Sequence, residues 1–314
     1  MNPVEHPVGR GLRIGLAADN GEWHRGRLLD ALRGCGIEPV LFSLADVAMI
    51  TGGGEPLRIP GFEGELPDGV LLRTISGGTF EATTLRLGVL HALVAADVVV
   101  WNDPRAIERC VDKSMTSLLI ARTGLPTPDT FVVSSREAAA EIVRREARPG
   151  VPLVLKPLFG SQGEGLRLID GPDDLPQPEE VARVYYLQRF VRRNVEGWRD
   201  YRVFVCDGRV VAAMAREGDG WITNVHQGGR PSRWQMPEEA EDLALRAAQA
   251  VDVSFCGVDL IEDERGRFLL LEVNSMPSWS GLQSIVDIDI SQAIVRAFLK
   301  AVYAARRPAM VAVS

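Results

Sequence analysis

The sequence has few cysteines and few lysines, and it has no long apolar run. Its 314 residues include 4 cysteines, which lie far apart and form no Cys-x-x-Cys pair; this excludes a zinc ribbon and a disulfide framework. No stretch reaches the roughly 18 apolar residues that a transmembrane helix needs, and the first residues lack the apolar core of a signal peptide. We therefore expect a cytoplasmic protein with reduced, buried thiols and no membrane partner.

Positive charge is also scarce, since 35 basic residues stand against 42 acidic ones and the formal net charge is −7. This balance excludes the overall basic footprint of a nucleic-acid-binding protein. Anionic ligands would have to bind in local cationic pockets. The 46% hydrophobic and 25% charged residues are typical of a globular protein, and the length predicts two or three domains.

The first hundred residues alternate short apolar strands with helical patterns. Strands are expected at residues 12–17, 37–43, 69–73 and 97–101, with helices at 26–33 and 83–94. Such alternation is typical of a parallel sheet covered by helices on both faces. The stretch 51–69 is rich in glycine and proline and is expected to be a loop.

The pattern changes near residue 104 and predicts a small α+β domain. A helix is expected at 112–123 and a strand at 131–133, followed by a helix that Ser134 and Glu137 introduce in capping-box spacing. The remaining strands of this domain are expected at residues 152–157 and 165–169.

Strands dominate from residue 184 onward. They are expected at 185–191, 201–206 and 209–215, with Asp207-Gly208 as a two-residue hairpin turn. A helix at 237–251, a last hairpin and a helix at 290–305 follow. The sequence thus predicts an N-terminal parallel-sheet α/β domain at 1–104, a central α+β domain at 105–184 and a C-terminal antiparallel-sheet α+β domain at 185–314.

The last hairpin carries three oxygen-bearing side chains. Asp259 lies in the middle of an apolar strand at 255–262, and Glu272 and Asn274 lie on the returning strand at 267–274. Oxygen ligands of this kind suit Mg²⁺, which is usually completed by water and substrate phosphates. The alternative is a set of exposed acids on the solvated face of an edge hairpin.

A specific register brings these groups together. If Glu262 pairs with Arg267, Asp259 faces Leu270 and lies diagonal to Glu272. All three oxygen-bearing groups then share one face of the hairpin, because side chains alternate along a strand. A slip of one residue would separate them.

Only three lysines stand against 32 arginines, and one of them precedes a glycine-rich loop. Lys156 ends an apolar strand, and Gly160-Ser161-Gln162-Gly163 follows. Such a loop can turn its backbone N–H groups toward an anion, and lysine is a compact charge for phosphate. It is not a Walker A loop, because the lysine precedes the glycines. The alternatives are a plain hairpin turn and, for Lys113, a solvated lysine at the start of a helix.

Together these motifs resemble an ATP-grasp ligase and, more narrowly, the RimK-type amino-acid ligases. The resemblance covers residues 102–290 and rests on Asp112-Lys113-Ser114, Lys156 with its loop, Leu187-Gln188-Arg189-Phe190-Val191 and Glu272-Val273-Asn274-Ser275-Met276-Pro277. It implies an ATP-grasp fold of three domains with ATP between the second and third. It also implies an ADP-forming ligase that joins a carboxylate to an amine through an acyl phosphate.

The resemblance implies a role for each matching residue. The nucleotide-binding set comprises Lys113 and Lys156 at the phosphates, the lid residues Gly160, Ser161, Gln162 and Gly163, the adenine hinge Gln188, Arg189 and Phe190, Asp200 at the ribose, and Thr223 and Asn224 toward phosphate and substrate. Arg202 and Lys156 would hold charge that develops during transfer. Asp259, Glu272 and Asn274 would hold Mg²⁺, with two ions expected and Mn²⁺ as a substitute.

Two residues depart from the family pattern. Arg189 stands where the hinge often has an acid, and Gln227 stands where an arginine often precedes the glycine pair. The first departure affects the ribose contacts, and the second affects the substrate contacts. Neither removes the metal ligands or the two lysines.

The resemblance implies L-glutamate as the incoming amine. Residues 274–283 look most like ligases that glutamylate C1 carriers of the tetrahydromethanopterin or methylofuran type, so a small-molecule carboxylate is the expected acceptor. The alternatives are a protein C-terminus or a carrier protein, met by Arg192, Arg193 and Arg199, or a non-catalytic ATP sensor. Trp221 and Trp279 would stack on a flat ring or belong to the core. Analogy with the family alone suggests a homodimer or a homotetramer, and the sequence itself does not fix the assembly.

Overall fold

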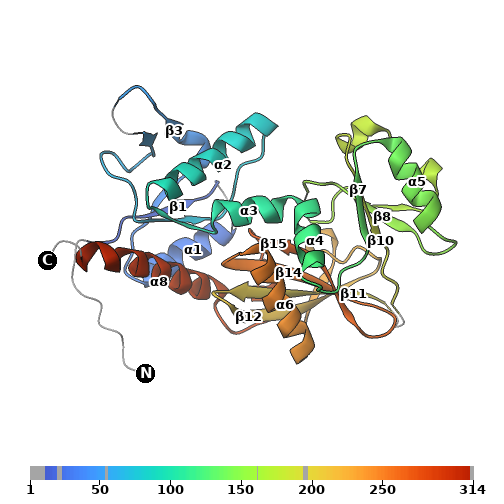
Figure 1. Ribbon diagram of the computed structural model, residues 1–314. Helices are drawn as coiled ribbons and strands as arrows, with labels where there is room; N and C mark the ends of the chain where they lie inside the picture. Colours follow the sequence, from blue (N-terminus) through green and yellow to red (C-terminus); the bar gives the residue numbers. More distant parts are fainter. Residues whose placement is uncertain (1–10, 20–22, 54–55, 161, 194–196, 312–314) are drawn as a thin grey trace. The chain divides into compact units, whose positions relative to one another are not determined.

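The computed structural model describes residues 11–19, 23–53, 56–160, 162–193 and 197–311. The chain divides into two compact units (Figure 1). One unit combines Met1–Pro104 with Ser291–Ser314, and the other is Arg105–Ile290. The domain boundaries expected at residues 104 and 184 stay predictions. Among the described residues, no helix has the length and apolarity that crossing a bilayer requires.

The first unit contains the expected parallel sheet. Its strands are ordered β2-β1-β5-β6, and all neighbouring pairs are parallel: β1 (Ile14–Ala17), β2 (Val40–Phe42), β5 (Gly69–Leu72) and β6 (Val99–Trp101). The helices of this unit are α1 (Trp23–Gly34), α2 (Phe80–Ala95) and α8 (Ile290–Val311). Phe298 and Val302 of α8 pack against Gly69 so closely that a Cβ there would lie 2.6 Å from Val302 Cγ2.

The stretch expected to be a loop at 51–69 contains a short strand. β4 (Leu57–Arg58) pairs with β3 (Ala48–Met49), and Leu57 is buried. The prediction of a continuous loop was therefore wrong. The glycines and prolines limit the length of the strand, but the buried Leu57 still pairs with β3. The expectation of buried thiols holds for Cys110, Cys206 and Cys256, whereas Cys35 is exposed.

The second unit begins with α3 (Pro104–Val111), which the sequence did not predict, and α4 (Lys113–Arg122). A four-stranded antiparallel sheet follows in the order β7-β10-β8-β9: β7 (Thr130–Val133), β10 (Tyr185–Arg189), β8 (Leu153–Lys156) and β9 (Arg167–Ile169). Helix α5 (Arg136–Glu146) packs against this sheet. Its cap is Ser135, which accepts from Ala138 N, so the prediction of Ser134 was off by one residue. Single 3₁₀ turns lie at Leu44–Asp46, Pro172–Asp174, Pro178–Val181 and Val225–Gln227.

A five-stranded antiparallel sheet completes the second unit. Its order is β13-β12-β11-β14-β15: β11 (Trp198–Cys206), β12 (Arg209–Gly218), β13 (Arg230–Arg233), β14 (Phe255–Glu262) and β15 (Phe268–Asn274). The turn between β11 and β12 is the predicted Asp207-Gly208 pair, and both residues have positive φ, as a type I′ turn requires. The short helix α7 (Ser280–Gln283) follows the sheet.

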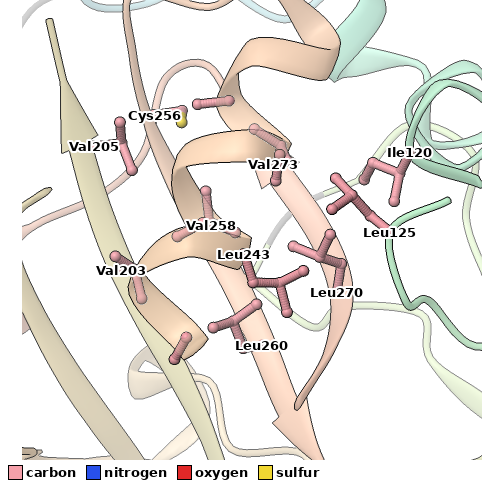
Figure 2. Packing of buried hydrophobic residues seen from close by; sticks show 14 of the residues in the cluster. Ile120, Leu125, Val203, Val205, Leu243, Cys256, Val258, Leu260, Leu270 and Val273 are labelled. Carbon is pink, nitrogen blue, oxygen red and sulfur yellow. The ribbon is translucent and has the colours of Figure 1, made fainter. Parts of the chain in front are cut away.

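One face of this sheet is apolar and is covered by α6 (Glu238–Val251). Figure 2 shows Leu243 of α6 packed with Val203, Val258 and Leu260 of the strands, and Ile120 of α4 lies beside Leu125 in the same cluster. Because residues alternate between faces, Arg202 and Asp259, the neighbours of these valines and leucines in sequence, point to the opposite face. The fold therefore presents its charged side chains on one side of a well-packed sheet.

Candidate functional site

The carboxylate hairpin brings Asp259 directly opposite Glu272. The predicted register, with Asp259 facing Leu270, was wrong. Glu262 pairs with Phe268 and Leu260 pairs with Leu270, and a bulge between Asp259 and Leu260 then shifts the pairing by one more residue. A bulge of this kind leaves no reliable mark in an apolar sequence.

The three oxygen-bearing groups nevertheless share a face. Direct cross-strand partners lie on one side of a sheet, so Asp259 joins Glu272 there, and Asn274 follows two residues later. Asn274 Nδ2 donates to Glu272 Oε1 at 2.9 Å, which leaves the amide oxygen of Asn274 as a further acceptor.

Two arginines and two aspartates form a buried charge cluster beside this hairpin. Arg202 is the cross-strand partner of Asp259, and Arg216 is the cross-strand partner of Asp200. Arg202 donates from Nε to Asp259 Oδ1 at 2.8 Å and from Nη2 to Oδ2 at 2.7 Å. Arg216 donates from Nε to Asp200 Oδ1 at 2.6 Å, and its Nη2 lies 3.1 Å from Asp259 Oδ2. We call Asp200, Arg202, Arg216 and Asp259 the charge cluster.

The charge cluster keeps Asp259 and Arg216 ionised in spite of burial. Burial raises the pKa of the Asp259 carboxyl, but the guanidinium groups of Arg202 and Arg216 outweigh it and hold that pKa well below its usual range. Burial lowers the pKa of Arg216, and Asp200 and Asp259 more than reverse this. The two positive and two negative charges of the cluster neutralise one another, whereas a single unpaired charge buried there would be strongly destabilising.

Sequence reasoning missed Arg216. The strand prediction ended at residue 215, one residue before it, whereas β12 continues to Gly218. The available signal was an arginine directly after an apolar strand in a hairpin whose other strand carries Asp200. A bulge between Phe204 and Val205 moves the pairing by one residue, so counting from the turn would have paired Asp200 with residue 215.

The two predicted phosphate lysines approach the same carboxylate. Lys156 lies at the end of β8, and Lys113 lies in the first turn of α4. Burial lowers the pKa of Lys156, and the negative charge of Glu272 acts against this. Burial likewise lowers the pKa of Lys113, again opposed by Glu272. Two poorly hydrated ammonium groups that share one carboxylate would gain from a further anion such as a phosphate.

Gln188, which the family resemblance places at the adenine hinge, contacts the side chain of Lys156. Its side chain is buried, and Oε1 accepts a hydrogen bond of 2.7 Å from Lys156 Nζ. Its Nε2 donates to Thr130 Oγ1 at 3.0 Å. The amide oxygen therefore orients the ammonium group of Lys156, and the amide nitrogen is held by Thr130.

One pocket brings most of the predicted site together. Of the predicted residues it is lined by Lys113, Lys156, Gly160, Gln162, Gly163, Gln188, Arg189, Phe190, Asp200, Thr223, Asn224, Asp259 and Glu272. Arg202 and Asn274 do not line it, and each is joined to it through its hydrogen bond to Asp259 or Glu272. Ser161 lies outside the described residues.

The glycine-rich loop lies against residues 222–227. Gln227 Nε2 donates to the carbonyl oxygen of Gln162 at 2.9 Å, and Lys113 Nζ donates to that of Gly160 at 2.6 Å. Gly163 has φ +75°, and a Cβ there would lie 2.5 Å from Asn224 Oδ1. Gln227, which departs from the family pattern, thus holds the backbone of the loop, and Gly163 is required for its approach.

Aromatic side chains form one wall of the pocket. Phe190 meets Trp198 and Trp221 edge to face, with ring centroids 5.9 and 6.1 Å apart, and all three line the pocket. Such a wall suits a planar ring. Trp279, the other tryptophan considered for stacking, is 1% exposed and packs on Phe204, so it belongs to the core.

The other arginines singled out in the sequence are engaged by neighbours. Arg189 lines the pocket, but its guanidinium bonds Glu146 and lies 2.9 Å from Asp129 Oδ2. In the basic patch, Arg192 donates to the Gly150 carbonyl, Arg193 lies 3.6 Å from Glu262, and Arg199 pairs with Glu217 at 2.7 Å. The patch is therefore largely paired with acids and carbonyls.

The donor set fits a hard divalent cation. Asp259, Glu272 and Asn274 offer only oxygen atoms to such an ion, and they stand on one face next to the two lysines. This combination is typical of Mg²⁺ sites that also hold substrate phosphates.

Comparison with known proteins shows the family of this chain. The sequence matches the RimK-like ATP-grasp domain over residues 110–298. A tetrahydromethanopterin:alpha-L-glutamate ligase of Methanocaldococcus jannaschii is 38% identical over 214 residues, covering 65% of this chain and 71% of that protein. Its counterpart from Methanosarcina acetivorans is 31% identical over 311 residues, covering 86% and 93%.

Solved structures share the fold. The ATP-grasp ligase PsnB, in complex with a variant of its minimal precursor, Mg and ADP, superimposes with a TM-score of 0.72 at 22% identity, covering 93% of this chain and all of PsnB. A RimK domain ATP-grasp protein of Sphaerobacter thermophilus gives a TM-score of 0.66 at 19% identity, covering 91% and 99%. The predicted fold class, with its parallel, central and C-terminal sheets, is confirmed. The chain belongs to the RimK-like ATP-grasp family and is an ADP-forming ligase that makes amide bonds.

Proposed function

We propose that the protein uses ATP to join L-glutamate to a carboxylate of a small-molecule C1 carrier of the tetrahydromethanopterin or methylofuran type. The observation that carries this proposal is the convergence of Lys113 and Lys156 with Glu272 and Asp259 in one pocket. The names of two relatives at 31–38% identity support glutamate and a tetrahydromethanopterin-type acceptor.

The nucleotide has a natural orientation in this pocket. The aromatic wall of Phe190, Trp198 and Trp221 suits the adenine ring, and the two ammonium groups suit the phosphates. A divalent ion held by Glu272, Asn274 and Asp259 would supply Lewis-acid charge at the phosphate oxygens. The glycine-rich loop would lie over them.

The chemistry needs positioning and charge rather than a protein nucleophile. The terminal phosphoryl group of ATP moves to an acceptor carboxylate oxygen, which gives ADP and an acyl phosphate. The glutamate amine then attacks the acyl carbon, phosphate leaves and the nitrogen loses a proton. Lys156 would hold the transferred group, and Arg202 would hold a substrate or phosphate oxygen. The loop held by Gln227 would exclude water from the acyl phosphate.

A thiol plays no part in this scheme. Burial raises the pKa of both Cys110 and Cys206 to about 12, so both remain protonated at neutral pH. A thiolate is the nucleophilic form, so neither residue is suited to attack a carbonyl.

Product identification tests the proposal. Purified protein is incubated with ATP, Mg²⁺ and L-glutamate, and with a tetrahydromethanopterin-type cofactor, a peptide ending in glutamate or a carrier protein as acceptor. We expect ADP and a cofactor heavier by one glutamyl residue in the mass spectrum. A product only on the peptide or the carrier would overturn the acceptor class, and AMP would overturn the acyl-phosphate route. Bound ATP that never turns over would indicate a sensor.

A further inference from the structure

A guanidinium group already occupies the carboxylate of Asp259 that the proposed metal site needs. Arg202 donates to both oxygens, at 2.8 and 2.7 Å, and Arg216 Nη2 lies 3.1 Å from Oδ2. A carboxylate offers about four lone-pair directions, and these contacts use three of them. A divalent cation can bind Asp259 closely only after one of these donors has moved away.

The two arginines differ in their freedom to move. Arg216 has a side chain that is 3% exposed, and both Asp200 and Asp259 hold it. Arg202 has a side chain that is 11% exposed, and beyond Asp259 it makes one long contact of 3.4 Å with the Ser278 carbonyl. Arg202 is therefore the donor that an incoming cation would displace.

The hydrogen-bond partners of Glu272 differ from those of its cross-strand partner Asp259. Both carboxylates line the pocket that also contains Lys113 and Lys156, but Glu272 accepts a hydrogen bond from the amide of Asn274, whereas Asp259 is held by the guanidinium groups of Arg202 and Arg216. The first contact of a cation entering from the pocket would thus be Glu272. Asp259 would follow by exchanging one positive partner for another.

We propose that Arg202 is a surrogate cation, which holds the Asp259 carboxylate until a divalent ion takes its place. This exchange explains how a buried aspartate stays compensated in the metal-free protein, where an unpaired charge would be strongly destabilising. It also releases a guanidinium beside the pocket when the metal is bound, ready for an anionic substrate. The inference rests on the proposed metal site and does not depend on the identity of the acceptor.

The proposal predicts whether the affinity for a divalent cation rises or falls when the charge of Arg202 is removed. If Arg202 competes with the cation, removing its charge makes the cation bind more tightly. If Arg202 only orients Asp259 for the metal, the same change makes it bind more weakly. The two roles are therefore separated by metal affinity alone, without any measurement of activity.

The test is a titration of the nucleotide-free protein with Mn²⁺, followed by electron paramagnetic resonance of the free ion. Arg202→Gln should bind Mn²⁺ about tenfold more tightly than the wild type. The matched control is Arg246→Gln, because Arg246 pairs with Asp242 on the exposed face of α6, and its affinity should not change. Equal or weaker binding by Arg202→Gln would overturn the proposal.

Two further variants secure the result. Arg202→Lys keeps the charge but loses the two-pronged contact, so its affinity should lie between those of the wild type and Arg202→Gln. If Arg202→Gln does not fold, tighter binding by Arg202→Lys supports the proposal, and equal or weaker binding contradicts it. Glu272→Ala should abolish tight Mn²⁺ binding; if it does not, the proposed metal site and this inference both fail. A missing glutamyl product, with the Mn²⁺ shift present, would refute only the substrate.

Discussion

Gln188 Oε1 accepts a hydrogen bond of 2.7 Å from Lys156 Nζ across two neighbouring strands of the central sheet. Lys156 pairs in register with Tyr186, and Gln188 lies two residues further along β10 on the same face. The amide also donates to Thr130, so it cannot turn away from the lysine without losing a second bond. A neutral partner of this kind orients the ammonium group and leaves its charge for a ligand.

Replacing Gln188 by leucine should weaken nucleotide binding. The change removes the acceptor that orients Lys156, and a hydrogen bond to a charged group contributes about 1.5 kcal/mol or more. We expect the KM for ATP to rise about tenfold. The alkaline limb of the pH profile should also move to lower pH, because the charged lysine loses a stabilising acceptor. Gln249→Leu, on the exposed side of α6, is the control, and an unchanged KM in Gln188→Leu would contradict the assignment.

Nucleotide affinity should fall at alkaline pH before the ordinary range of a lysine is reached. Burial lowers the pKa of Lys156 and of Lys113 in the free protein. Phosphate contacts favour the charged form, so binding takes up a proton above the lowered pKa and weakens as pH rises. The slope is about tenfold per pH unit for one lysine.

Calorimetry of ADP binding across pH, in buffers with different heats of ionisation, measures this proton uptake directly. Lys156→Arg keeps its charge throughout, so only the contribution of Lys113 should remain. Wild-type affinity that stays constant up to pH 10 would argue against phosphate contacts by either lysine.

Glu272→Gln should lower kcat strongly and preserve the fold. The negative charge of this carboxylate acts on both Lys113 and Lys156, and the group is a proposed metal ligand that lines the pocket. Losing charge stabilisation at a reacting centre typically lowers kcat by about a hundredfold to a thousandfold. ADP release in a coupled assay gives the rate, and circular dichroism monitors the fold. Glu239→Gln, on the exposed face of α6, should behave as the wild type; a near-normal rate for Glu272→Gln would remove the metal assignment.

Gly163→Ala should disturb the glycine-rich loop specifically. Its φ of +75° is unfavourable for alanine by about 1–2 kcal/mol. The added Cβ would also lie 2.5 Å from Asn224 Oδ1 and 3.0 Å from Gln227 Nε2. We expect kcat/KM for ATP to fall at least tenfold. Gly171→Ala provides the comparison, because a Cβ there meets nothing within 4 Å; equal effects of the two changes would show that the loop contact is unimportant.

Much of the fold followed from the pattern of apolar residues. The apolar run at 255–262 predicted β14 with its observed ends. The pair Asp207-Gly208 predicted the hairpin of β11 and β12, because two positive φ angles strongly select those residue types. Helix α3 was not predicted. It begins at Pro104 and lies immediately before α4 in the sequence. The change in residue pattern near Pro104 indicates a domain boundary and does not by itself indicate a helix.

The site was less accessible to sequence reasoning because contacts between strands decide it. The bulges beside Asp259 and Phe204 each shift a ladder by one residue, and both are set by packing rather than by local composition. Gln188 shows the same limit: its place in the hinge motif was visible, but which way its amide faces depends on Lys156 and Thr130 from two other strands.

Every predicted site residue that the structure describes belongs to the stretch from Arg105 to Ile290. The residues proposed to bind ATP and to carry the reaction thus lie in one continuous stretch of the chain. A change in the remaining segments of the chain therefore leaves this set of residues intact.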